Sequence, residues 1–122
     1  MLNPDYREML CLLQEHNVEF LVVGAFALAA HGYPRATGDI DIWVKPSPDN
    51  AERIYRALSE FGAPLQEIDE STFAASNVVF QIGVAPRRID LMTSISGDIP
   101  FDGAKSRCAD QKLEGVRIPF LS

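Results

Sequence analysis

The segment TGDIDIWVKP, residues 37–46, places two aspartates at alternate positions of an otherwise largely apolar run. Side chains two residues apart leave the same face of a β-strand, about 7 Å apart along the chain, so a strand over 39–44 brings Asp39 and Asp41 to one face. Aspartate is a poor strand former, and like charges on one face repel each other. Two interpretations stay open: an edge strand with a solvated acidic face, or a pair of ligands for a divalent cation such as Mg²⁺.

The surrounding sequence predicts helices alternating with strands in the first half of the chain and mainly strands in the second. Asn3 and Pro4 are typical of a helix start, and Gly62 is typical of a helix end. We expect helices over 4–16, 24–32 and 48–61 and strands over 18–23, 39–44, 78–85 and 87–94. Loops are expected over 33–37 and 71–77, a turn or short helix over 100–109, and a hairpin over 112–122. This order predicts an α/β (α+β) fold, with helices packed on a mixed sheet, in a single domain over residues 1–122.

Composition excludes several classes of protein. The formal charge of −6 over 122 residues argues against a nucleic-acid binder that ignores sequence, because such proteins carry a basic face. The longest apolar run, residues 20–30, is too short to span a bilayer, and the N-terminus lacks the basic start and apolar core of a signal peptide. Cys11 and Cys108 show no paired or metal-type spacing, although a single disulfide stays open. We expect a soluble cytoplasmic protein without a membrane partner.

A third carboxylate lies in the predicted strand RRIDLMTS, where Arg88, Asp90 and Met92 face one way. Three clustered carboxylates would raise each other's pKa values, whereas carboxylates that share divalent cations can serve phosphoryl or nucleotidyl transfer. For Arg88, a salt bridge to Asp90 is the interpretation we favour over a direct role. Lys45 could also face this site.

Gly24 ends one predicted strand and opens the next predicted helix. Backbone N–H groups at a helix start bind phosphate, and a glycine lets the phosphate approach closely. For Gly24 taken alone, a tight strand-to-helix turn is the interpretation we favour. Trp43 shares the face of the two aspartates, and core packing is the interpretation we favour for it. His31 is expected to form hydrogen bonds at a helix end.

The ordered set VVGAFALAAHGYPRATGDIDIWV followed by RIDLM resembles the nucleotidyltransferase superfamily typified by DNA polymerase beta, over residues 18–97. Within it, the spacing of GA, HG, R, T, D and D is similar to that of bacterial AbiEii-type toxins. The resemblance implies a Mg²⁺-dependent enzyme that moves a nucleoside monophosphate from an NTP to an acceptor hydroxyl of a tRNA, a protein or a small molecule.

The same resemblance implies the roles of individual residues. Asp39, Asp41 and Asp90 would be catalytic and would hold the metal. A second set, Gly24, Ala25, Arg35 and Thr37, would bind the nucleotide.

The sequence departs from this family at two places. Ala25 stands where many members have glycine or serine. The C-terminal helices of relatives have no counterpart in these 122 residues. An inactive nucleotide-binding or protein-interaction module of the same fold is therefore the alternative. A toxin paired with an antitoxin protein is a further hypothesis, and the sequence does not indicate the oligomeric state.

Overall fold

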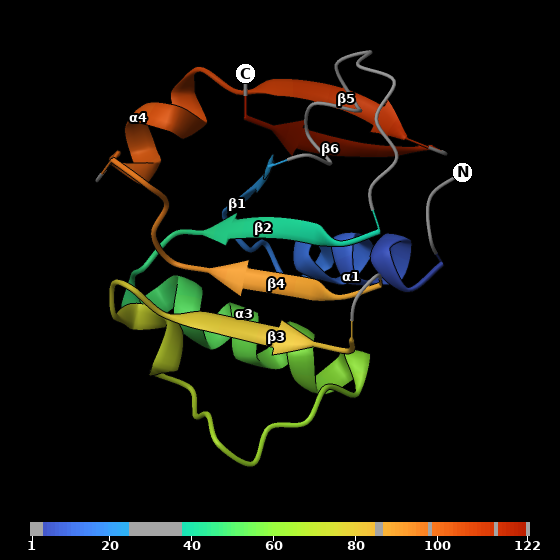
Figure 1. The fold of residues 1–122 in the computed structure, drawn as a ribbon, viewed down its shortest axis with the longest axis vertical. Helices are drawn as coiled ribbons and strands as arrows, with labels where there is room; N and C mark the ends of the chain where they lie inside the picture. Colours follow the sequence, from blue (N-terminus) through green and yellow to red (C-terminus); the bar gives the residue numbers. More distant parts are fainter. Residues whose placement is uncertain (1–3, 25–37, 85–86, 98, 114, 122) are drawn as a thin grey trace.

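The computed structural model describes residues 4–24, 38–84, 87–97, 99–113 and 115–121 (Figure 1). In these ranges the strands form one six-stranded sheet in the order β3-β4-β2-β1-β6-β5. The strands are β1 (Phe20–Val23), β2 (Ile40–Val44), β3 (Val79–Ile82), β4 (Ile89–Met92), β5 (Ala109–Leu113) and β6 (Val116–Phe120). The helices are α1 (Pro4–Glu15), α3 (Pro48–Phe61) and α4 (Phe101–Ser106), with a 3-10 turn η1 (Thr72–Ala74).

The sheet is mixed, as the sequence predicts. Strand β2 runs parallel to β4 and antiparallel to β1, while β1 runs parallel to β6. The outer pairs, β3 with β4 and β5 with β6, are antiparallel. The central strands β4, β2 and β1 therefore lie side by side although β4 follows the other two by more than forty residues of chain.

Helices α1 and α3 cover one face of the sheet and lie behind it in Figure 1. The main core forms between these helices and the inward side chains of the strands, among them Leu13, Ile42, Ile54, Leu91 and Phe120. The opposite face is apolar only in part. A smaller cluster there joins Leu21, Val23 and Trp43 to Phe101 and Ala104 of α4. Polar side chains occupy the rest of that face.

Helix α3 begins and ends where the sequence predicts. The Ser47 hydroxyl accepts a hydrogen bond from the backbone N–H of Asn50 at 3.3 Å, and Pro48 takes the first helical position. Gly62 ends the helix in the left-handed region, with φ of +91°. Asn17, after α1, likewise has a positive φ of 58°.

The strands are shorter than their sequence patterns. Strand β4 covers four residues of the predicted 87–94, and β3 covers four of the predicted 78–85. Asp39 precedes β2 by one residue rather than lying in it. The segment 71–77, predicted as a loop, contains η1, because Phe73 is fully buried against the core. The helix predicted over 24–32 lies outside the described residues except for Gly24, and the loop over 33–37 lies wholly outside them.

Neither a membrane-spanning helix nor a disulfide is found in the described part of the chain. Among the described helices, none has the length and apolar character needed to cross a membrane. Cys11 and Cys108 are both free thiols.

Asn50 joins three elements at the end of the sheet away from the aspartates. Its side-chain oxygen accepts from the Glu19 N–H at 2.8 Å, and its amide nitrogen donates to the carbonyls of Glu19 and Lys45 at 3.1 and 3.0 Å. Asn50 is fully buried, so these bonds are made out of contact with water. The side chain thereby ties the start of α3 to the ends of β1 and β2.

Replacing Asn50 with alanine should lower the free energy of unfolding by about 1–3 kcal/mol, because the Glu19 N–H loses its buried partner, while the carbonyls of Glu19 and Lys45 keep the bonds that they accept from backbone N–H groups. Urea denaturation monitored by circular dichroism measures the loss. Ser59→Ala, on the exposed side of the same helix, is the matched control and should change the stability by less than about 0.5 kcal/mol. Equal effects from the two substitutions would show that the hydrogen bonds of the Asn50 side chain do not stabilise the fold.

Candidate functional site

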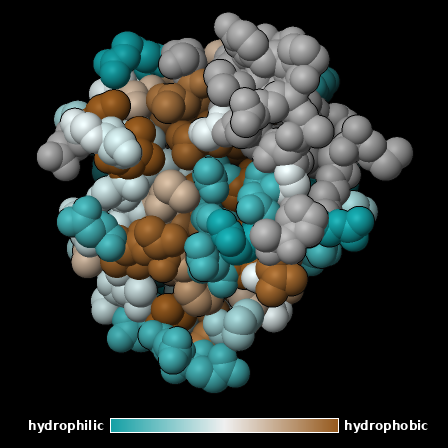
Figure 2. Space-filling model, in the orientation of Figure 1, coloured by the Kyte–Doolittle hydropathy of each residue, from teal (hydrophilic) through white to brown (hydrophobic). Residues whose placement is uncertain are grey.

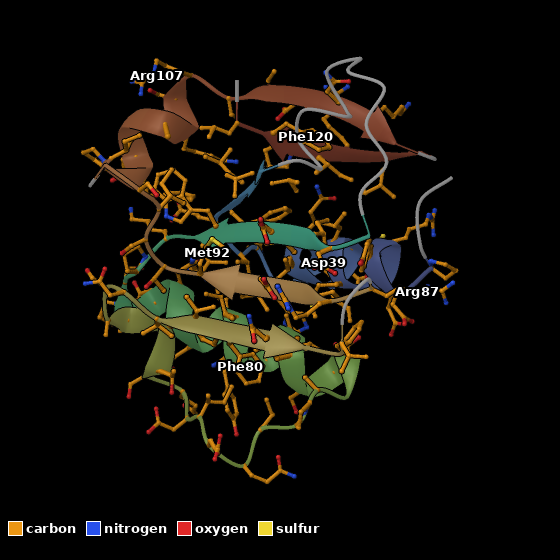
Figure 3. All side chains as sticks on the ribbon, viewed as in Figure 1. Asp39, Phe80, Arg87, Met92, Arg107 and Phe120 are labelled. Atoms are coloured by element: carbon orange, nitrogen blue, oxygen red, sulfur yellow. The ribbon has the colours of Figure 1, made fainter. Side chains whose placement is uncertain are left out.

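The parallel pairing of β2 with β4 places two of the predicted carboxylates opposite each other. Asp41 pairs with Asp90 in the register of the two strands, and Trp43 pairs with Met92 two residues further on. These side chains point to the face that α1 and α3 leave uncovered, while Ile40, Ile42, Ile89 and Leu91 point into the main core. Figure 3 shows Asp39 at the amino end of β2 and Met92 at the carboxyl end of β4.

Gly24 lies against Asp41 from the neighbouring strand. Its φ of +76° is in the left-handed region, and a Cβ at this position would stand 2.7 Å from the Asp41 Oδ2 atom. A side chain here would therefore be strained by the backbone and would collide with the carboxylate. The sequence predicts Gly24 as a phosphate-approach residue. The structure adds a second reason for glycine, which is room for the Asp41 carboxylate.

Burial is the main cause that raises the pKa of Asp41 above its ordinary value. The negative charges of Asp90 and Asp39 and a hydrogen bond with the Asp90 carboxyl raise it further, and the positive charge of Arg88 lowers it. Asp41 thus experiences the repulsion from Asp90 and Asp39 that the sequence predicts. A cation bound among these groups would relieve it.

Arg88 supplies positive charge to the cluster. Its Nε and Nη2 atoms lie 2.7 Å and 3.1 Å from the two carboxylate oxygens of Asp90, which form a bidentate pair. The same Nη2 atom lies 3.6 Å from Asp39 Oδ2, and the Arg88 backbone N–H donates to Asp39 Oδ1 at 2.9 Å. The predicted salt bridge between Arg88 and Asp90 is confirmed, and Asp39 joins the same network.

Tyr6 is a supporting residue that sequence reasoning missed. The pattern of α1 marks it only as a core side chain, yet its hydroxyl donates to the carbonyl of Gly38 and lies 3.4 Å from the carbonyl of Arg88. Burial, followed by the charge of Asp39, raises the pKa of this hydroxyl. Tyr6 therefore fastens the backbone beside Asp39 to the helix behind the sheet. No pattern in the sequence signals a contact between residues 6 and 38.

The donor atoms of the cluster suit Mg²⁺, which prefers oxygen ligands and usually takes one or two carboxylates, with phosphates and waters completing its shell. Within the described ranges, however, no three His, Cys, Asp or Glu side chains are arranged to hold a metal ion together. Arg88 engages both oxygens of Asp90. The residues present therefore fit a site of one or two carboxylates completed by a substrate, and the three-carboxylate site stays a prediction.

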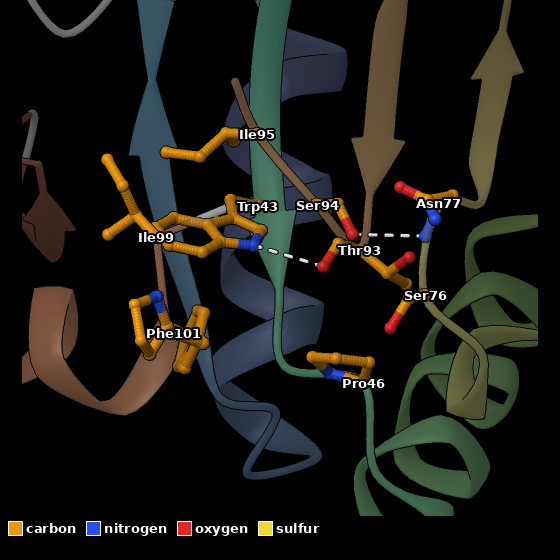
Figure 4. A pocket seen from close by; sticks show the side chains of 10 residues that line it. Trp43, Pro46, Ser76, Asn77, Thr93, Ser94, Ile95, Ile99 and Phe101 are labelled. Atoms are coloured by element: carbon orange, nitrogen blue, oxygen red, sulfur yellow. Dashed lines mark hydrogen bonds between the residues drawn. The ribbon is translucent and has the colours of Figure 1, made fainter. Parts of the chain in front are cut away.

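A pocket of about 370 Å³ lies on the same face, at the carboxyl ends of β2 and β4 (Figure 4). Trp43 is buried there as the sequence predicts. Its indole N–H donates to the Thr93 carbonyl at 3.2 Å, and its ring packs edge-on to Phe101 with centroids 5.1 Å apart. None of the described lining residues is ionisable; they are Trp43, Pro46, Ser76, Asn77, Thr93, Ser94, Ile95, Ile99, Pro100 and Phe101.

The face as a whole carries a polar band beside an apolar area. Figure 2 shows hydrophilic side chains across the middle of this face, over β2 and β4, with hydrophobic side chains next to them toward the carboxyl ends of these strands. Lys45, at that end, pairs with Asp102 at 3.1 Å and lies 3.9 Å from Glu19. It is thus engaged away from the aspartates, in contrast to the prediction that it could face the site.

Four of the predicted site residues are brought together: Gly24, Asp39, Asp41 and Asp90. The other three predicted nucleotide-binding residues, Ala25, Arg35 and Thr37, lie outside the described residues. Their roles stay predictions, as does that of His31.

Comparisons with known proteins support the fold. The chain matches a crystal structure from Thermotoga maritima, described as a putative nucleotidyltransferase, with a TM-score of 0.68 and 19% sequence identity. The match covers 100% of this chain and 80% of the other. No protein-family model and no curated protein matches the chain. The mixed α/β fold is therefore shared with that structure, and the similarity to AbiEii-type toxins stays a prediction.

Replacing Gly24 with alanine should destabilise the protein by about 0.5–1 kcal/mol more than Gly62→Ala does, because the Asp41 carboxylate must turn away from the added Cβ. Both glycines have a positive φ, but nothing lies within 4 Å of a Cβ added at Gly62, whereas at Gly24 it meets Asp41. Urea denaturation of both variants isolates the contact from the backbone strain.

A double-mutant cycle sharpens this comparison. In an Asp41→Ala background the added loss at Gly24 should largely disappear, because the colliding oxygen is gone. A Gly24→Ala loss that is unchanged in that background would show that the close approach to Asp41 has no energetic weight.

Asp41→Asn should stabilise the protein at neutral pH in the presence of a chelator. Because the folded-state pKa of Asp41 is raised from 3.8, the folded state binds the proton more tightly than the unfolded state, and wild-type stability falls as the pH rises through that pKa. The Asp41→Asn variant does not lose stability in this way as the pH rises. Its advantage should therefore be absent near pH 3 and level off near pH 7, at roughly 0.5–1 kcal/mol since solvent screens the repulsion.

Asp69→Asn is the control of opposite sign. Hydrogen bonds from Ser71 hold the pKa of Asp69 below its ordinary value, so this carboxylate contributes stability above its unfolded pKa and loses that contribution as the pH falls. Denaturation series across the same pH range should show the two variants diverging from wild type in opposite directions. Parallel behaviour would contradict the repulsion among the carboxylates.

Proposed function

We propose that this protein is a Mg²⁺-dependent nucleotidyltransferase, which moves a nucleoside monophosphate from an NTP to an acceptor hydroxyl and releases pyrophosphate. The observation that carries the proposal is the placement of Asp41 opposite Asp90 on adjacent parallel strands, with Gly24 against Asp41. The fold shared with the Thermotoga maritima structure, which is described as a putative nucleotidyltransferase, supports it.

Asp39 and Asp41 are the residues that would hold Mg²⁺, because they lie together at the amino end of β2 and carry the oxygen donors that this ion prefers. Bound there, Mg²⁺ supplies charge neutralisation of the phosphates and of the leaving pyrophosphate. The protein contributes mainly by positioning the reactants. Gly24 leaves room for the triphosphate to approach the backbone.

The order of the strands suggests how the reactants lie. Gly24 follows β1, Asp41 lies in β2 and Asp90 lies in β4, and these strands are neighbours in that order. In an in-line displacement, the attacking and leaving oxygens lie on opposite sides of the phosphorus. With the pyrophosphate toward Gly24, the acceptor comes from the β4 side.

Asp90 is then the group placed to accept the proton. The acceptor oxygen forms a bond to the α-phosphorus, the bond from that phosphorus to the bridging oxygen of the pyrophosphate breaks, and the hydroxyl proton passes to the Asp90 carboxylate. The pocket beyond Trp43 lies on this side of the face and presents hydroxyl and amide groups from Ser76, Asn77 and Ser94. An uncharged part of the acceptor fits such a lining.

A nucleotide-binding module without turnover is the second candidate, and the hold of Arg88 on both Asp90 oxygens favours it. A carboxylate engaged in this way is a poor proton acceptor until the guanidinium moves. The two candidates share the nucleotide site and differ only in whether transfer follows binding.

Calorimetric titration with each of the four NTPs and Mg²⁺ should show binding to the wild type and at least a tenfold loss in the Asp39→Asn, Asp41→Asn variant, since each charged ligand contributes strongly. Glu52→Gln, Glu60→Gln removes the same charge from α3, behind the sheet, and should bind as the wild type does. Equal binding by all three proteins would sink the proposal.

Turnover then separates the two candidates. Pyrophosphate release, followed with the bound NTP and fractions of tRNA, protein and small metabolites, should occur with one fraction and should stop in Asp90→Asn. Binding without release from any fraction would favour the module.

A further inference from the structure

Arg88 is placed where it opposes the divalent cation that the neighbouring carboxylates suit. Its guanidinium spans both oxygens of Asp90 and one oxygen of Asp39. The Asp90 side chain is 9% exposed, so few directions remain from which another cation could reach these oxygens. An ion bound to them would stand beside a fixed positive charge, and the two cations would repel each other.

The Arg88 guanidinium can also move away from these carboxylates. Its side chain is 31% exposed, and its planar fork binds a phosphate with the same geometry as a carboxylate. A phosphate-bearing substrate on this face therefore offers Arg88 an alternative partner. If the fork moves to the phosphate, both oxygens of Asp90 become available to other partners.

We propose that Arg88 is a positioning residue that competes with the divalent cation for Asp39 while it occupies Asp90 beside it, and that a phosphate of the nucleotide draws it away from both. Arg88 thereby ties loading of the metal to arrival of the nucleotide. The second half of the proposal rests on the proposed function, while the competition with the metal does not. The two effects are reciprocal. If the nucleotide phosphate raises the affinity for the metal by moving Arg88, the bound metal raises the affinity for the nucleotide by the same factor.

The proposal predicts effects of opposite sign from a single substitution. Arg88→Gln should bind Mn²⁺ or Mg²⁺ alone about tenfold more tightly than the wild type, because the competing cation is gone. The same variant should bind the Mg²⁺–NTP complex about tenfold more weakly, because it lacks the fork for the phosphate. A residue that serves only to stabilise the fold would weaken both or change neither.

Two further variants separate the guanidinium from general effects of charge. Arg56→Gln removes one positive charge on α3, where Arg56 contacts Glu52, and should leave both affinities unchanged. Arg88→Lys keeps the charge but loses the bidentate fork, so it should shift both affinities toward those of Arg88→Gln. If both Arg88→Gln and Arg88→Lys bind metal as the wild type does, the residue at this position does not compete with the ion, and the proposal fails.

Isothermal titration calorimetry gives the affinities. Paramagnetic resonance of free Mn²⁺ gives an independent measure of how much metal is bound in the absence of nucleotide. Loss of Arg88 leaves a buried carboxylate without its partner and lowers stability, so thermal unfolding is measured in parallel. Added Mg²⁺ should raise the melting temperature of Arg88→Gln more than that of the wild type. If Arg88→Gln does not fold, the same comparison is made with Arg88→Lys.

The outcomes distinguish this inference from the proposed function. Tighter metal binding by the variant with no Mg²⁺–NTP binding by either protein would support the competition and refute the nucleotide site. Mg²⁺–NTP binding by the wild type with unchanged or weaker metal binding by the variant would overturn the inference and leave the proposed function standing.

Discussion

The parallel pairing of β2 with β4 is the constraint on which the site depends. Their register sets Asp41 opposite Asp90, although 49 positions separate them in the chain. The apolar alternation of both strands fixes which face they present, because a slip by one residue would turn Ile42 and Leu91 out of the core. The energy that holds two carboxylates together therefore comes from the other face of the same strands. The two aspartates are thus kept in place mainly by the burial of the apolar side chains on the other face of their strands.

This arrangement explains why a costly cluster persists. Like charges close together destabilise a fold, and burial, followed by the negative charges of Asp90 and Asp39, raises the pKa of Asp41. Arg88 compensates part of that repulsion from inside the cluster rather than from solvent. The balance resembles that of many functional sites, where a local conflict is tolerated because the surrounding structure determines the geometry.

Much of the fold could be predicted from the sequence, since it rests on local signals. Ser47, Pro48 and Gly62 mark the ends of α3, and the alternation in RRIDLM assigns Asp90 and Ile89 to opposite faces. The acidic positions were predictable for the same reason. Tyr6 was not, because its bond to Gly38 depends on how α1 crosses the sheet. The strand ends also differed, since β-patterns continue beyond the last ladder bond.

The hydrogen bond of Tyr6 makes the N-terminal helix part of the scaffold of the candidate site. When α1 detaches in a local unfolding event, the peptide that precedes Asp39 loses its anchor while the central strands can remain paired. The sheet persists in that state, while the acidic corner keeps the bonds between Asp39 and Arg88 and loses its support from the helix. Amide protons beside Asp39 should thus exchange with solvent together with those of α1, and proteolysis near the first helix would disturb the candidate site from the far side of the sheet.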